Sequence, residues 1–129
     1  MTVLTLEQLL ELHAVVIAET GGAKGLRDLG RLESAIAAQT QNVFGEELYP
    51  GLPDKAAALI RGIIADHPFV DGNKRTAMLV GLTFLSLNGV ALKFKKGEIE
   101  DFAVAIAVQK LDTAAIARWL RRHSIKGRR

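Results

Sequence analysis

Hydrophobic residues recur with a helical period along most of the chain. In residues 6–17 they follow the i, i+3, i+4, i+7 spacing of an amphipathic helix. Thr5 and Gln8 suit a capping box before this segment, and the glycine pair at 21–22 suits its end. After the glycine-rich turn GGAKGLRDLG, a second helix is predicted over residues 31–39.

The middle of the chain predicts two more apolar helices. Pro53 suits the first turn of a third helix. The apolar face of this helix consists of Ala56, Leu59, Ile60, Ile63 and Ile64. A fourth helix is predicted from about residue 73 to residue 87, and the Asn-Gly pair at 88–89 suits its end. Because residues 77–87 are apolar nearly all round, the fourth helix is predicted to be the central, buried one.

The last third of the chain adds two helices. They are predicted over residues 98–109 and 113–123, and Asp112 suits the N-cap of the second. Only the segment VALKFK, residues 90–95, alternates like a strand. The predicted class is therefore all-α, with about six helices around a buried central helix and strand content near zero or confined to a small hairpin.

Composition narrows the kind of protein. Of 129 residues, 49% are apolar and 24% are charged, which excludes a disordered chain, and this length suits one domain over residues 1–129. No apolar stretch is long enough to span a membrane. The N-terminus does not resemble a signal peptide, and there is no cysteine for a disulfide or a thiolate nucleophile. We therefore expect a soluble, cytoplasmic protein.

Positive charge gathers at the C-terminal end. Residues 118–129 hold six of the 17 cations and no acid, so residues 1–117 hold 11 cations against 14 acids. Cations suit the negative end of a last helix and a solvated terminus. The alternative is a docking strip for an acidic partner or nucleic acid, but these cations have only Trp119 among them as an aromatic neighbour.

The stretch IIADHPFVDGNKRTAMLV, residues 63–80, places polar groups inside an otherwise apolar run. His67 continues the apolar stripe of the third helix, being seven residues after Ile60 and four after Ile63. Pro68 disfavours helical geometry at the residue before it, so the helix should end at His67. We expect His67 to point inward from a helix C-terminus.

The start of the fourth helix has the composition of an anion site. Asn73 or Asp71 is expected to cap it. Its first turn presents unpaired N–H groups and two cations, Lys74 and Arg75, while Gly72 permits close approach of the backbone. These features suit phosphate.

Two further groups next to this anion site suit chemistry. His67 is able to accept a proton near neutral pH, and Asp71 is a carboxylate suited to Mg²⁺. A base, a metal ligand and an anion site together indicate group transfer from a nucleotide to a hydroxyl. Taken singly, a histidine at a helix end is more often a core residue, and Asp-Gly-Asn is a common turn. The phosphate loops of other nucleotide-binding families are absent from the sequence.

The segment HPFVDGNKR, residues 67–75, resembles the motif of the Fic/Doc superfamily, which reads histidine-x-phenylalanine-x-acid-glycine-asparagine-x-arginine. The segments GGAKGLRDLGRLESAI, LYPGLPDKAAAL and TAMLVGLTFLSLNGV resemble the death-on-curing (Doc) branch, the toxins of type II toxin–antitoxin modules. The resemblance thus spans most of the chain, and it implies the compact helical fold of that family.

The resemblance implies a role for each motif residue. His67 would deprotonate the acceptor hydroxyl, Asp71 would hold Mg²⁺, and Phe69 would anchor the loop in the core. The remaining four would bind the phosphates of the nucleotide, the first two through the anion cradle: Gly72, Asn73, Lys74 and Arg75.

Two departures from the motif bear on the reaction. Fic enzymes that transfer AMP usually have a glycine after the asparagine and a second arginine three residues after the first, where this chain has Lys74 and Met78. In the Doc branch, this pattern goes with transfer of the terminal phosphate of ATP to a threonine of elongation factor Tu, which arrests translation. The resemblance therefore implies a protein kinase toxin, with AMP transfer as the alternative. No inhibitory [ST]-x-x-x-E-[GN] segment is present, so inhibition is expected from a separate antitoxin encoded nearby.

Two alternatives of other classes remain. A metal-dependent hydrolase would need about three protein ligands, and no second histidine follows His67 at ligand spacing. A non-enzymatic helical domain that binds DNA through residues 118–129 would bind with a steep dependence on salt.

Several residues outside the motif also carry expectations. His13 lies on the apolar face of the first helix and is predicted to be a core residue, whereas His123 is expected to be exposed. Trp119 fits either the core or a groove for the antitoxin. The sequence does not place Arg27 or Arg31 relative to the site.

Overall fold

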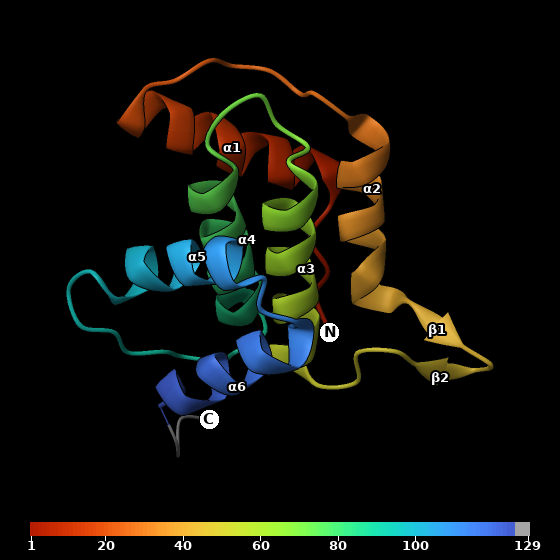
Figure 1. Cartoon of the computed structure of the whole chain (residues 1–129). Coiled ribbons are helices and arrows are strands. Elements are labelled where there is room, and N and C mark those ends of the chain that lie inside the picture. Colours follow the sequence, from red (N-terminus) through yellow and green to blue (C-terminus); the bar gives the residue numbers. More distant parts are fainter. Residues whose placement is uncertain (126–129) are drawn as a thin grey trace.

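The computed structural model describes residues 1–125, and in this part of the chain six helices account for most of the fold (Figure 1). The helices are α1 Leu6–Thr20, α2 Leu29–Ala37, α3 Leu52–Asp66, α4 Asn73–Leu87, α5 Glu98–Gln109 and α6 Thr113–His123. A 3₁₀ turn, Ala38–Thr40, follows α2, and two short strands, β1 Asn42–Val43 and β2 Glu46–Glu47, form an antiparallel hairpin. The all-α class is therefore confirmed.

Local sequence explains most helix ends. The Thr5 hydroxyl accepts from Gln8 N at 3.2 Å and Thr5 N donates to Gln8 Oε1 at 2.9 Å, so the capping box of α1 is confirmed. Gly21 ends this helix at φ 76°. Asp112 caps α6 as predicted, since its Oδ1 accepts from Ala115 N at 2.8 Å.

Two adjacent helices form the centre of the fold. The buried face of α4 packs on α3, and α3 in turn also contacts α2, α5 and α6. The two central helices approach closely at Gly81, where a side chain would overlap that of Ile60. The loop at 67–72 joins the end of α3 to the start of α4 (Figure 1).

The two short strands do not lie in residues 90–95, where the alternation of hydrophobic and polar residues predicted a strand. Residues 90–95 form no strand, because their partner is only the few residues after α6, with one bridge between Leu92 and Ser124. The hairpin instead lies between α2 and α3, at the end of the molecule away from the 67–72 loop (Figure 1). Its turn has positive φ at Phe44 (51°) and Gly45 (82°), and the Phe44 side chain is fully exposed.

An aromatic stack closes the core beneath α6. Trp119 is buried and lies against Phe102, with ring centroids 4.0 Å apart and planes 4° apart, so it belongs to the core. The expectation for His123 is wrong: it is half-buried, its ring lies 4.1 Å from that of Trp119, and its Nε2 lies 3.0 Å from Glu98 Oε2. No helix within residues 1–125 is long and apolar enough to cross a membrane.

Candidate active site at the junction of α3 and α4

His67 ends α3 but does not point inward. It is the C-cap residue, in the left-handed region at φ 48° and ψ 59°, and it is exposed. The expectation of an inward ring extrapolated the helical stripe by one residue too many, because a left-handed residue turns its side chain out of that stripe. An exposed imidazole is the form that a proton acceptor for an external substrate requires.

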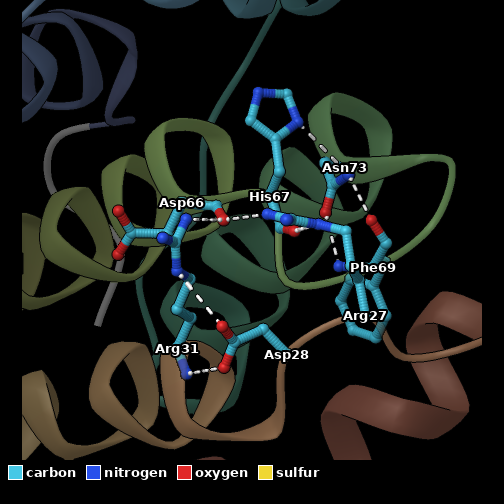
Figure 2. Close-up of polar contacts among 7 residues, drawn as sticks. All are labelled: Arg27, Asp28, Arg31, Asp66, His67, Phe69 and Asn73. Carbon is cyan, nitrogen blue, oxygen red and sulfur yellow. Dashed lines mark hydrogen bonds and ion pairs between the residues drawn. The ribbon is translucent and has the colours of Figure 1, made fainter.

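Asn73 was one of two residues expected to cap α4, but its side chain does not do so. It bonds instead to the backbone of the preceding loop. Its Oδ1 accepts from Phe69 N at 3.0 Å and its Nδ2 donates to Phe69 O at 2.9 Å, and the side chain of Phe69 is buried. The same Nδ2 lies 3.5 Å from His67 Nδ1 (Figure 2). Asn73 thereby holds the loop closed directly beside the imidazole.

The first turn of α4 has no side-chain cap from residues 1–125. The N-cap residue is Gly72, at φ 78°, and no side chain of this part of the chain caps the N–H groups that follow. Neither Asn73 nor Asp71 therefore takes the capping role, since both side chains bond elsewhere. An uncapped N-terminus leaves donors and a partial positive charge for an external anion.

Asp71 is exposed, and one of its two carboxylate oxygens is already used. Oδ2 accepts from Ala23 N at 2.7 Å, while Oδ1 has no hydrogen bond to residues 1–125. The described residues contain no group of three His, Asp or Glu side chains that suits a metal. A Mg²⁺ ion often binds through only one or two carboxylates together with substrate phosphates and water, and Asp71 fits that arrangement.

The two cations of the motif line a groove of their own. Lys74 and Arg75 are exposed and border an apolar groove of about 620 Å³ between α1, α4 and α5, whose floor includes Met78. His67 instead borders a hollow of about 300 Å³ between α3 and α5, together with Lys110. The structure thus brings His67 next to Asn73, the first residue of α4, whereas Lys74 and Arg75 line a groove that does not include His67.

The segment before α2, residues 23–28, contacts the loop at 67–72 through several hydrogen bonds. A bridge joins Leu26 to Phe69, and Arg27 N donates to Pro68 O at 2.6 Å. The Arg27 guanidinium donates to His67 O (2.7 Å) and Asp66 O (2.8 Å), and Arg31 Nη1 donates to Asp66 O at 3.0 Å (Figure 2). Hydrophobic periodicity does not reveal these contacts, because exposed polar side chains make them to backbone atoms 35 to 40 positions away in the sequence.

Comparison with known proteins identifies the family of this chain. The sequence model described as the Fic/DOC family matches residues 3–85, which include the whole of the 67–75 motif, and the chain therefore belongs to the Fic/DOC family. It is 42% identical over 99 residues to "Toxin Doc" of Mycolicibacterium smegmatis, covering 75% of this chain and 76% of that protein. It is 35% identical over 116 residues to "Protein kinase doc" of Escherichia phage P1, covering 90% of each chain.

Proposed function

We propose that this protein is a toxin that transfers the terminal phosphate of ATP to a hydroxyl group of a translation factor. The observation that carries the proposal is the exposed imidazole of His67 beside the uncapped N-terminus of α4. Similarity over 90% of both chains to a relative named a protein kinase supports phosphate as the group transferred.

Each site residue has a place in this reaction. A ring nitrogen of His67 takes the proton of the acceptor hydroxyl, and the acceptor oxygen forms a bond to the γ-phosphorus. The bond from this phosphorus to the β–γ bridging oxygen breaks, and ADP leaves. The N–H groups after Gly72 stabilise the negative charge on the transferred group, and Lys74 and Arg75 bind the phosphates of the nucleotide. Mg²⁺ held by Asp71 would neutralise further phosphate charge.

Met78 favours phosphate transfer over AMP transfer. It lies one turn after Arg75 in α4, at the position where AMP-transferring relatives usually have a second arginine, and it is buried. A thioether provides no donor for a phosphate oxygen. The site therefore offers one fewer phosphate contact than AMP transfer uses.

Two protein partners follow from the proposal. The acceptor is elongation factor Tu, and a cognate antitoxin, encoded nearby, holds the toxin inactive. Binding of DNA through residues 118–129 is less favoured, because Trp119, the aromatic residue among these cations, is buried in the core and does not offer its ring to a base. Residues 126–129 of that basic segment lie outside the described residues.

Labelled ATP tests the reaction directly. After incubation of the protein with elongation factor Tu, the factor should carry label from γ-labelled ATP and no label from α-labelled ATP. His67→Ala should lower the rate by roughly 10²- to 10⁴-fold, which is the usual contribution of a general base. Label transferred from the α-position would establish the AMP alternative instead, and an unimpaired His67→Ala variant would remove His67 from the reaction.

A further inference from the structure

The C-terminal end of α3 has no basic residue from its own helix, and Arg27 and Arg31 from the segment around the start of α2 interact with it instead. No basic residue lies in the last turn of α3, although the final carbonyl groups of a helix carry partial negative charge. Arg27 donates from Nε to His67 O and from Nη2 to Asp66 O, so one guanidinium holds two consecutive carbonyls. Arg31 adds a donor to Asp66 O alone.

The carbonyl that Arg27 holds belongs to the residue with the unusual backbone. His67 is one of three residues other than glycine with positive φ within residues 1–125. Such a conformation costs about 1–3 kcal/mol and persists only where neighbouring groups enforce it. Two neighbours act on this backbone: Arg27 donates to the His67 carbonyl, and Pro68 disfavours right-handed helical geometry at the residue before it.

The direction of the His67 ring follows from this conformation. Figure 2 shows the imidazole projecting away from both arginines, on the side of Asn73. If φ of His67 returned to the helical region, the ring would move into the stripe of Ile60 and Ile63 and leave the position facing Asn73.

We infer that Arg27 is a positioning residue, which keeps His67 in its left-handed conformation and so directs the imidazole toward the acceptor. Arg27 touches neither nucleotide nor acceptor in this role; it acts on the backbone of His67. The effect on the reaction rests on the proposed phosphate transfer, whereas the effect on the His67 backbone does not.

The contacts are at an exposed end of α3, so water is able to replace the lost donors when Arg27 is changed. Arg27→Gln should therefore leave the protein folded, with a melting temperature close to that of the unchanged chain. Misplacement of a reacting group by about 1 Å costs on the order of 10²-fold in rate. We expect Arg27→Gln to lower kcat about 10- to 100-fold and to leave KM for ATP within about twofold, because Lys74 and Arg75 are untouched.

Three variants separate positioning from a general effect of charge. Arg27→Lys keeps the charge but not the planar two-pronged donor, and it should restore only part of kcat. Arg31→Gln should have a smaller effect, since Arg31 does not reach the His67 carbonyl. Arg118→Gln removes an exposed cation of α6, far from His67 in the sequence, and should change neither kcat nor KM.

An activity-independent measurement decides the inference. The HN–Hα coupling and the Cα and carbonyl chemical shifts of His67, measured by NMR, report φ at this residue. In Arg27→Gln they should leave the left-handed values, while Arg118→Gln keeps them. Unchanged values in Arg27→Gln would overturn the inference. If the unchanged chain transfers no phosphate, the proposed function fails, and the NMR values of Arg27→Gln still decide the role of Arg27.

Discussion

A side chain at Gly72 would crowd Ile17 of α1. A Cβ at Gly72 would lie 3.2 Å from Ile17 Cδ1 and 3.4 Å from Val16 Cγ1, and φ at Gly72 is 78°. The backbone at the start of α4 is thus pressed against α1, and only glycine combines this φ with this contact without strain.

Gly72→Ala should accordingly destabilise the protein by more than the cost of placing alanine in the left-handed conformation. Gly97→Ala is the matched control, because Gly97 is also an N-cap at positive φ (85°) but has no atom within 4 Å of the position that a Cβ would take. Each change should cost about 1 kcal/mol or more from φ, with a further cost from contact only at Gly72. Urea unfolding of both variants measures the difference. Equal losses would show that the contact with Ile17 is unimportant.

Asn73→Ala should lower both stability and activity. It removes two hydrogen bonds to Phe69 in a buried setting, and the unpaired N–H and C=O of Phe69 would each cost about 1–3 kcal/mol unless water reaches them. Asn42→Ala is a suitable control, since its side chain makes one exposed bond to Thr40 O. Chemical denaturation should show a clear loss for Asn73→Ala and almost none for Asn42→Ala. A loss of less than about half a kcal/mol at Asn73 would contradict its role in fastening the loop.

Phe44→Asn should stabilise the hairpin. Phe44 and Gly45 both have positive φ, as in the two-residue turns that prefer Asn-Gly, and a phenylalanine in the left-handed region costs about 1–2 kcal/mol. The substitution also removes a fully exposed aromatic ring. Thermal unfolding should show a higher melting temperature than the unchanged chain. Phe44→Ala, which keeps the strain of positive φ, should not produce this gain, and a decrease for Phe44→Asn would contradict the turn geometry.

Acid should weaken the contact between α5 and α6 through Glu98. The pKa of Glu98 lies below its ordinary value of 4.5, because its carboxylate accepts from the backbone N–H of Lys95 and, second, from His123. A carboxyl whose pKa is lower in the folded state adds stability above its unfolded pKa and loses it as pH falls through the folded value. Stability should therefore decline as pH falls below about 4.5. Glu98→Gln should flatten this part of the profile, and an unchanged slope would contradict it; Glu100→Gln on the same helix turn is the control.

Hydrophobic periodicity was sufficient to predict the six helices, and the capping residues of α1 and α6 fixed where those two begin. The bounds of α4, α5 and α6 agree with the predicted ranges, and Asp112 caps α6 where expected. The beginning of α2 was predicted two residues late, because the capping bond from Arg31 N to Asp28 at 3.1 Å is invisible to hydrophobic spacing. The hairpin was missed because its four strand residues do not alternate in hydrophobicity and are all exposed.

The site was predictable as a set of residues but not as an arrangement. The motif identified His67, Asp71 and Asn73, which lie between the C-cap of α3 and the first residue of α4. The outward direction of His67 was not predictable, because it depends on a left-handed residue. Nor were the contacts of Arg27, which join residues 40 positions apart in the sequence.

The intact mass of elongation factor Tu after incubation with this protein, ATP and Mg²⁺ distinguishes phosphate transfer from AMP transfer in one experiment. We expect a gain of one phosphate per molecule, absent when His67→Ala replaces the unchanged chain. A gain of one AMP, or the same gain with His67→Ala, would contradict this expectation.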